Sequence, residues 1–472
     1  MNKSPEGRYL FRYVSARVVF VAMGFLGFNL VYAYKVVLSM SIIAMTNHTG
    51  SSVNSSDCIA NEVNKTSTTT FPGEKFDWDS DVQSQVLSSF FYGYILTQIP
   101  AGILATKYGG KWIYGTSLFI AAIFSILGPI AAKVDYRLFM VTRIIQGLAE
   151  GVVFPCMNTL IAQWMPKMER TRGTTIIQTG SMIGTVITLP LTALMCKSNF
   201  MGSWPATFYI LGVAGIIWYA LWIVLVYESP ETHPFISKAE MDYILENDGG
   251  FKLKENLSIP YKEMFTSIPV IALTLTHFGQ NWGFLTVLNL MPTYMNNVLH
   301  MQINENMLIS GLPYLGQAIF GWIISYITDK IRQSGRVEIT TLRKINCFIA
   351  YMPPAICLAL IPTARCDTTY SSILFILAMT FNGACFSGMN STHVDMAPDH
   401  AGTLMGITNS FGNIPGFLAT IVANQFTGKG QTIHNWSYVF YLSAGVFVAN
   451  TFIYGIFASA REQSWGRTPK KQ

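Results

Sequence analysis

Apolar residues along this chain gather into long runs that are separated by short polar segments. A helix of about 20 apolar residues is long enough to cross the hydrocarbon core of a bilayer. The runs are too long and too continuous for the alternating segments of about ten residues that build a membrane β-barrel. The pattern therefore predicts an all-α polytopic membrane protein with twelve spanning helices, at 17–45, 84–107, 112–133, 137–163, 171–195, 204–227, 268–298, 305–329, 341–363, 371–397, 401–425 and 436–460.

Composition excludes several other classes of protein. Of 472 residues, 51% are hydrophobic and only 12% are charged, whereas soluble domains carry about 25% charged residues. A cytosolic enzyme, a secreted disulfide scaffold and a disordered chain are therefore excluded. The net charge is +6 without a long basic tract, so we expect a lipid bilayer and no nucleic acid as partner. The seven cysteines lack C-x-x-C spacing, so we expect no metal site.

The positions of Lys and Arg indicate the orientation of the spans. If both termini are cytoplasmic, the inner segments hold 22 of the 31 basic residues and the outer loops hold seven. Cytoplasmic loops of membrane proteins carry this excess. The largest inner loop, 228–267, then divides the spans six and six. We expect a cytoplasmic tail at 1–16, a six-helix half at 17–227, the linker at 228–267, a second half at 268–460 and a tail at 461–472.

The outer loop at 46–83 is polar and contains three glycosylation sequons. These sequons begin at Asn47, Asn54 and Asn64, and we expect the loop to be glycosylated there. Cys58, Cys196 and Cys366 fall on or beside outer loops, where a disulfide can form. The sequence leaves open which two of them pair.

The two halves share a weak internal repeat. The second span ends in Thr106-Lys107, and the eighth span ends 223 residues later in Asp329-Lys330. Gly173-Thr174 in the fifth span and Gly402-Thr403 in the eleventh are related by an offset of 229. Parallel six-helix halves joined by a cytoplasmic linker are typical of the major facilitator architecture, in which the substrate site lies midway between the halves.

Four longer stretches of the sequence resemble one particular family. These stretches are Phe90–Gly102 in the second span, Gly147–Pro155 in the fourth, Leu290–Met295 in the seventh, and Asp395–Asn409 between the tenth and eleventh. In this order, from about residue 17 to 460, the chain resembles the anion–cation symporter family of the major facilitator superfamily. That family contains sialin, the vesicular glutamate transporters and the type I sodium/phosphate cotransporters.

The short basic turns after the second and eighth spans resemble the gating turns of this superfamily. Lys107, Asp329 and Lys330 occupy the expected places. Thr106 replaces the expected acid in the first turn, and Ser325 replaces the expected glycine in the second.

A polar stripe marks the fourth span. Arg143, Gln146 and Glu150 lie on one face of a helix, because seven residues make about two turns. A charge in mid-bilayer costs roughly 2.5–3.5 kcal/mol, so the stripe predicts either a cavity wall, which we favour, or a structural Arg143–Glu150 ion pair. The resemblance implies that carboxylates on this stripe couple the driving ion. Since Gln146 stands where sialin-like members have glutamate, Glu150 is the main candidate.

Lys35 is the candidate for contact with an anionic substrate. It lies ten residues before Met45, roughly 15 Å from the end of its span, which is too far for its side chain to reach the interface. The resemblance implies an arginine here that binds substrate carboxylate. Lysine keeps the charge but loses the bidentate fork. Arg143 would also neutralise the anion, and Tyr32 would line the cavity or join helices.

Polar residues also interrupt the seventh span. His277 is either a proton carrier or a hydrogen-bonded packing residue, and Gln280 and Asn281 follow it as candidate substrate contacts. The resemblance implies a histidine at His277. Vesicular glutamate transporters carry arginine at Gln280 and histidine at Leu87, so these two departures argue against vesicular glutamate loading.

The sequence thus predicts a secondary active transporter of small anions, inorganic phosphate or organic, coupled to sodium or protons by alternating access. It predicts no enzyme, since no catalytic cluster or nucleotide-binding loop is present, and no cofactor. The alternatives are a receptor or scaffold without turnover and a polytopic membrane enzyme that acts on lipid. We expect a monomer in the plasma membrane, with a lysosomal or vesicular membrane as the alternative location.

Overall fold

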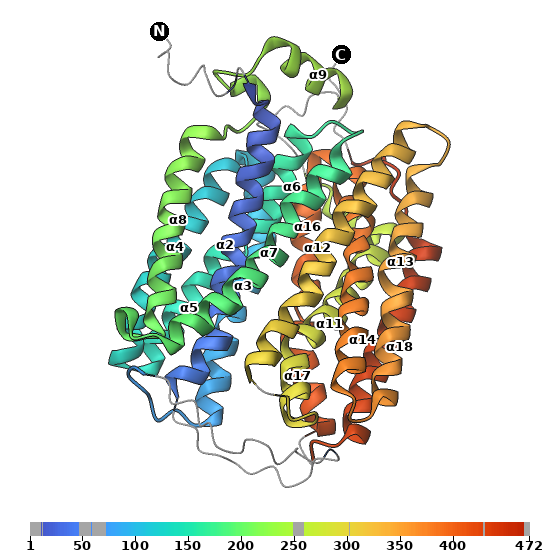
Figure 1. Ribbon diagram of the computed structural model, residues 1–472. Coiled ribbons are helices and arrows are strands. Elements are labelled where there is room, and N and C mark those ends of the chain that lie inside the picture. Colours follow the sequence, from blue (N-terminus) through green and yellow to red (C-terminus); the bar gives the residue numbers. More distant parts are fainter. Residues whose placement is uncertain are drawn as a thin grey trace.

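The computed structural model describes residue 11 and residues 13–46, 58, 72–248, 259–301, 303–427 and 430–466. In these residues the regular structure is helical, apart from one isolated bridge between Thr46 and Phe76 (Figure 1). The first bundle contains α2 (Ala16–Met45), α3 (Ser80–Tyr108), α4 (Lys111–Val134), α5 (Tyr136–Glu150), α6 (Val153–Trp164), α7 (Arg170–Lys197) and α8 (Pro205–Leu225). The second contains α11 (Ile268–Asn297), α12 (Ile303–Gln333), α13 (Ile339–Leu360), α14 (Thr368–Asn382), α15 (Ser391–Met396), α16 (Ala401–Gly412), α17 (Pro415–Thr427) and α18 (Ile433–Phe457).

Each predicted span corresponds to one helix or to one chain of short helices, with ends that agree to within four residues. Within the described residues, nine of them are long and apolar enough to cross a membrane. The all-α prediction is therefore confirmed. Three spans are interrupted: the fourth at Gly151-Val152, the tenth by a π-helix at Phe386–Asn390, and the eleventh at Asn413-Ile414. The last break precedes Pro415, which has no N–H to continue a helix.

Small residues let neighbouring helices approach closely. A Cβ on Gly180 or Gly184 of α7 would lie 2.2 or 2.3 Å from the carbonyl oxygens of Phe25 and Asn29 on α2. The sequence spacing small-x-x-x-small predicts such contacts between membrane helices. The two bundles meet where α16 packs on α3 and α6, and where α12 packs on α7.

The first part of the linker binds to the N-terminal bundle. The Glu228 carboxylate accepts hydrogen bonds from the backbone N–H groups of Gly110 and Lys111, at 2.8 and 2.9 Å. Glu240, on α9 (Lys238–Asp248), accepts from the N–H groups of Ala16 and Arg17, at 3.0 and 3.1 Å. Unpaired N–H groups at helix starts favour such carboxylates. The linker therefore caps α4 and α2, at the end of the molecule where both termini lie (Figure 1).

A disulfide joins the two halves at the opposite end. It pairs Cys58, in the loop after α2, with Cys366, in the turn before α14, and their Cα atoms are 5.6 Å apart. Cys196 is a buried free thiol. Asn47, Asn54 and Asn64 lie outside the described residues, so their glycosylation stays a prediction.

Candidate functional site

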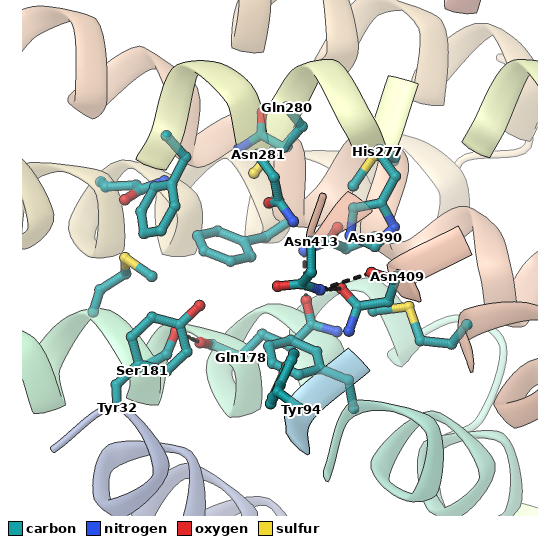
Figure 2. A pocket seen from close by; sticks show the side chains of 18 residues that line it. Tyr32, Tyr94, Gln178, Ser181, His277, Gln280, Asn281, Asn390, Asn409 and Asn413 are labelled. Atoms are coloured by element: carbon teal, nitrogen blue, oxygen red, sulfur yellow. Dashed lines mark hydrogen bonds between the residues drawn. The ribbon is translucent and has the colours of Figure 1, made fainter. Parts of the chain in front are cut away.

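A pocket lies between the two bundles and is lined by helices of both (Figure 2). Its wall is rich in side-chain amides, with tyrosine, serine and histidine between them. The polar lining residues are Tyr32, Tyr94, Gln178, Ser181, His277, Gln280, Asn281, Gln317, Asn390, Asn409 and Asn413. Four of the predicted site residues are among them: Tyr32, His277, Gln280 and Asn281. The position midway between the halves is the one the repeat predicts.

On the C-terminal side, hydrogen bonds hold these amides in fixed orientations. Gln280 and Asn382 donate to each other, at 2.8 and 2.9 Å, and Gln317 also donates to the Asn382 oxygen, at 2.9 Å. Asn281 donates to the Gly412 carbonyl at 2.7 Å. A connected network of this kind gives a rigid polar surface.

One amide on the N-terminal side keeps an open donor. The Gln178 oxygen accepts a hydrogen bond of 2.7 Å from Asn390 of the other bundle. Its Nε2 is buried without a hydrogen-bond partner among the described residues, as is the Gln317 oxygen. An unpaired buried amide group is costly, so both atoms can bind a polar ligand. Sequence reasoning missed Gln178, because a glutamine in a threonine-rich span has no distinctive spacing.

Lys35 lies behind the pocket wall, in a cage of four aromatic rings. Its ammonium nitrogen is 5.3 Å from the ring centres of Tyr32 and Tyr94, 5.0 Å from Phe91 and 5.9 Å from Phe90. Cation–π contacts stabilise a desolvated ammonium without neutralising it. Since Tyr32 and Tyr94 also line the pocket, the cation is separated from the pocket by a wall of aromatic rings.

The predicted stripe on α5 lies inside the N-terminal bundle. Arg143 donates to the Tyr34 carbonyl at 3.0 Å and to the Gln146 oxygen at 2.8 Å, and Gln146 donates to the Ala121 carbonyl at 3.1 Å. Glu150 is fully buried, and neither of its oxygens has a hydrogen-bond partner in the described part of the chain.

The structure does not place the stripe at the pocket. Arg143 and Gln146 bond to α2 and α4, and none of the three stripe residues is among those that line the pocket. Arg143 bonds to an amide and a carbonyl rather than to Glu150. The spacing correctly placed the three residues on one helical face but could not determine which neighbours that face would meet.

The two predicted gating turns meet the opposite half at the end of the molecule that the linker caps. Asp329 accepts a hydrogen bond from the Arg172 backbone N–H at 2.9 Å. Thr106, which replaces the acid in the other turn, pairs with the Thr403 hydroxyl at 3.0 Å. The two turns thus close with different chemistry, one charged and one neutral. Lys107 is exposed, and Lys330 lies 5.8 Å from the Tyr326 ring centre.

A buried ion pair supports the same region. Arg343 of α13 donates to Asp395 at 2.6 Å and to the Thr171 hydroxyl of the other half at 3.0 Å. Arg332 adds a bond to Asp395 at 3.3 Å. Sequence reasoning noted Asp395 near its span end but did not identify its partner. A basic residue in the first turns of the preceding span was the available signal.

Comparisons with known proteins agree with this geometry. The family model described as Major Facilitator Superfamily matches residues 23–420. Human sialin is 35% identical over 454 residues, which cover 96% of this chain and 91% of sialin. A putative inorganic phosphate cotransporter of Drosophila melanogaster is 34% identical, with 98% and 88% of the chains covered. Human vesicular glutamate transporter 2 is 32% identical, with 95% and 75% covered.

Solved structures show the same fold. The proton:xylose symporter XylE superposes with a TM-score of 0.67 at 13% identity, covering 95% of this chain and 98% of that one. The E. coli fucose:proton symporter FucP superposes with a TM-score of 0.61 at 13% identity, covering 94% and 100%. Two bundles around a central polar pocket, together with full-length similarity to sialin and its relatives, place this chain in the major facilitator superfamily, as a membrane transporter rather than an enzyme.

Proposed function

We propose that the protein is a secondary active transporter that couples the movement of small organic anions to protons by alternating access. The observation that carries this proposal is the caged ammonium of Lys35 beside a pocket of amides between the two halves. The two halves rock about the pocket, so that it opens to each side of the membrane in turn.

Lys35 supplies the attraction for the anion. Its four aromatic neighbours stabilise the ammonium but leave its charge without a counterion in the cage. A charge-assisted hydrogen bond to a carboxylate is stronger than a contact with a ring face. If an anion passes between Tyr32 and Tyr94 and contacts Lys35, the charge-assisted hydrogen bond that forms is therefore stronger than the cation–π contacts that the ammonium gives up.

The amides favour an organic anion over inorganic phosphate. Gln178, Gln280 and Asn281 present neutral donors and acceptors, which match the hydroxyl, amide or carbonyl groups of an organic molecule. Phosphate is the second candidate, because similar Drosophila chains are named putative inorganic phosphate cotransporters. Glutamate is disfavoured because Gln280 and Leu87 stand where the vesicular transporters have arginine and histidine.

Glu150 favours protons over sodium as the coupling ion. Its carboxyl group is fully buried and has no hydrogen-bond partner within the described residues. A buried carboxylate needs a partner charge or a proton, and a proton binds to it without requiring further ligands. Glu150 interacts electrostatically with Arg143 of its own helix and with Lys35 of α2, so a bound anion can sense its charge state.

An uptake panel in proteoliposomes tests this function. Inorganic phosphate and a series of carboxylates are offered while the sodium gradient and the pH gradient are varied separately. Lys35→Met, which has a side chain of similar length without the charge, is the inactive control. We expect uptake of a carboxylate that follows the pH gradient. Uptake that requires sodium, or that is limited to phosphate, would overturn the corresponding part of the proposal. Binding without flux would identify a receptor that has kept the transporter fold.

The membrane in which the protein works is a separate proposal. We propose the plasma membrane, with a lysosomal or vesicular membrane as the alternative. Surface biotinylation of the full chain tests this, with retention in acidic vesicles as the contrary result.

A further inference from the structure

Two buried histidines of the C-terminal bundle share one threonine hydroxyl. His277 Nδ1 on α11 lies 3.2 Å from Thr408 Oγ1 on α16, and His393 Nε2 on α15 lies 2.7 Å from the same oxygen. The second nitrogen of His393, Nδ1, lies 3.1 Å from the Asn390 carbonyl. His277 lines the pocket (Figure 2), whereas His393 is fully buried and is not among the lining residues.

The carbonyl fixes the direction of these hydrogen bonds. A carbonyl only accepts, so His393 Nδ1 carries a proton. In neutral His393, Nε2 must then accept, and Thr408 donates to it. The Thr408 oxygen in turn accepts from His277 Nδ1. Both neutral rings are therefore Nδ1–H tautomers, and Nε2 of His277 is left as a free acceptor for a proton from the pocket.

The same site also accommodates a charged His393. The Thr408 hydroxyl lies 3.4 Å from the Met405 carbonyl, which is a second acceptor for its proton. If His393 is protonated on both nitrogens, it donates to Thr408. The Thr408 hydroxyl then donates to the Met405 carbonyl or, once His277 has lost its Nδ1 proton, to His277 Nδ1.

A π-helical segment positions this chain of hydrogen bonds. Asn390 ends the π-helix Phe386–Asn390, and π-turns inside helices occur frequently at functional sites. The carbonyl of Asn390 accepts from His393, while its side chain donates to Gln178 of the other half, at 2.7 Å. The hydrogen bonds therefore run from the pocket through both histidines to a contact between the two halves.

We propose that His393, reached through the Thr408 hydroxyl, is a second proton site behind His277, and that its occupancy is transmitted to the Asn390–Gln178 contact between the halves. The proposal deepens the proton coupling proposed above and rests on it. One proton binds to His277 Nε2, the Nδ1 proton of His277 passes to Thr408, and the Thr408 proton passes to His393 Nε2. The net result is one added proton, stored on His393.

Few ionisable groups surround the pair. The two rings face each other, with centres 5.8 Å apart. Beside His393, the Tyr454 hydroxyl of α18 bonds to Thr392, and Asp395 is held by Arg343 and Arg332. From the pocket side, the titratable groups are Tyr32, Tyr94 and the thiol of Cys385, and Lys35 lies behind the two tyrosines. In the described residues no carboxylate bonds to either ring, so a proton here is held by dipoles alone.

Nitrogen NMR tests the tautomers without any transport assay. The full protein with ¹⁵N-labelled histidine is placed in lipid, and the resonances of His277 and His393 are assigned by their loss in His277→Gln and His393→Gln. We expect both to be Nδ1–H tautomers at neutral pH, the rarer form for free histidine. An Nε2–H tautomer at either residue would reverse the direction of the bonds and overturn the proposal.

Transport variants test the proton path. Thr408→Val removes the bridging hydroxyl at nearly constant volume, and Thr408→Ser restores it. Thr392→Val is the matched control, because it removes a neighbouring buried hydroxyl that bonds to Tyr454 instead. We expect Thr408→Val to reduce proton-driven uptake about tenfold, with exchange of substrate for substrate within about twofold of the parent. Thr408→Ser should recover most of the driven uptake.

The two proposals can fail separately. Equal losses in Thr408→Val and Thr392→Val, or an equal loss of driven uptake and exchange, would show a packing role for Thr408. If the uptake panel finds sodium coupling while both histidines are Nδ1–H tautomers, the proton coupling fails and the bridge remains as a structural device. If uptake is proton-coupled but either histidine is an Nε2–H tautomer, only the proposal of a second proton site at His393 fails.

Discussion

The two halves of this transporter have similar helices but bring different chemistry to the pocket. The N-terminal half contributes full charges, in Lys35, Arg143 and Glu150, and all three lie behind the pocket or away from it. The C-terminal half contributes amides and histidines, held in place by mutual hydrogen bonds. The contrast suggests a division of labour in which one half supplies long-range attraction and the other supplies shape and hydrogen-bond specificity.

The two predicted gating turns show the same asymmetry. The C-terminal turn closes through the acidic side chain of Asp329, whereas the N-terminal turn closes through the hydroxyl pair of Thr106 and Thr403. Charge has therefore been kept at one of two related positions and lost at the other. At the pocket and at the turns alike, the two halves differ in which of them carries a charged residue. This difference distinguishes them better than their sequence identity does.

The largest effect is expected for removal of the charge in the N-terminal half. Lys35→Ala should raise the apparent substrate constant about a hundredfold or abolish transport, because a charge-assisted contact is lost. Lys35→Arg should keep part of the activity, since the charge remains in a different geometry. Equilibrium binding to purified protein is the measurement. If Lys35→Ala binds the anion as tightly as the parent protein does, the anion contact does not lie in the N-terminal half.

Glu150→Gln should separate two modes of transport. We expect proton-driven accumulation to fall about tenfold or more, while exchange of substrate for substrate is retained, because exchange does not return an empty carrier. The protein should fold normally, since the amide avoids the cost of burying a charge. Radiolabelled uptake and exchange are measured side by side. Equal loss of both would make Glu150 a structural partner of Arg143 and weaken the proposed division.

A smaller effect is expected for the open amide donor. Gln178→Leu removes the unpaired Nε2 and the acceptor for Asn390, and should raise the apparent substrate constant about fivefold. Gln98→Leu is the matched control, because that buried glutamine lies on α3 outside the pocket. Competition assays across the anion panel provide the measurement. If phosphate uptake falls as much as carboxylate uptake, the amides do not select for the organic part of the substrate.

The smallest effect concerns the linker and stability alone. His233 sits among Phe11, Tyr227 and Trp164, with ring centres 4.6, 4.7 and 5.9 Å away, and this burial lowers its pKa to about 4. The neutral ring is favoured on folding, so its stabilising effect is complete above the unfolded pKa of about 6.5 and is lost as pH falls toward 4. Thermal unfolding should show a Tm that falls by a few degrees over that interval.

The matched variant for this prediction is His233→Phe, which keeps a ring and cannot titrate. Its Tm should depend less on pH between 6.5 and 4, while uptake at neutral pH is unchanged. If the Tm of His233→Phe depends on pH as strongly as that of the parent, other groups cause the effect. The neutral His233 ring would then not be what fixes the linker to the N-terminal half.

The helices could be predicted from sequence because the requirement to span a bilayer leaves a strong signal. Lys35, His277 and Glu150 could be singled out because ionisable residues in spans are rare. Their partners could not. Whether Arg143 meets Glu150 or Gln146 depends on helix rotation of a few tens of degrees, and Gln178 and Thr408 are neutral residues with no spacing that marks them. The amide pocket exists only once residues far apart in sequence are brought together.

The bond between Cys58 and Cys366, which are 308 positions apart in the sequence, turns an open polypeptide into a closed ring with two tails. One bundle is connected to the other along the backbone at one membrane face and through sulfur at the other. A single nick in the linker would then leave a molecule of full mass, which would separate into two fragments only after reduction. Each half can tilt against the other, but neither can diffuse away.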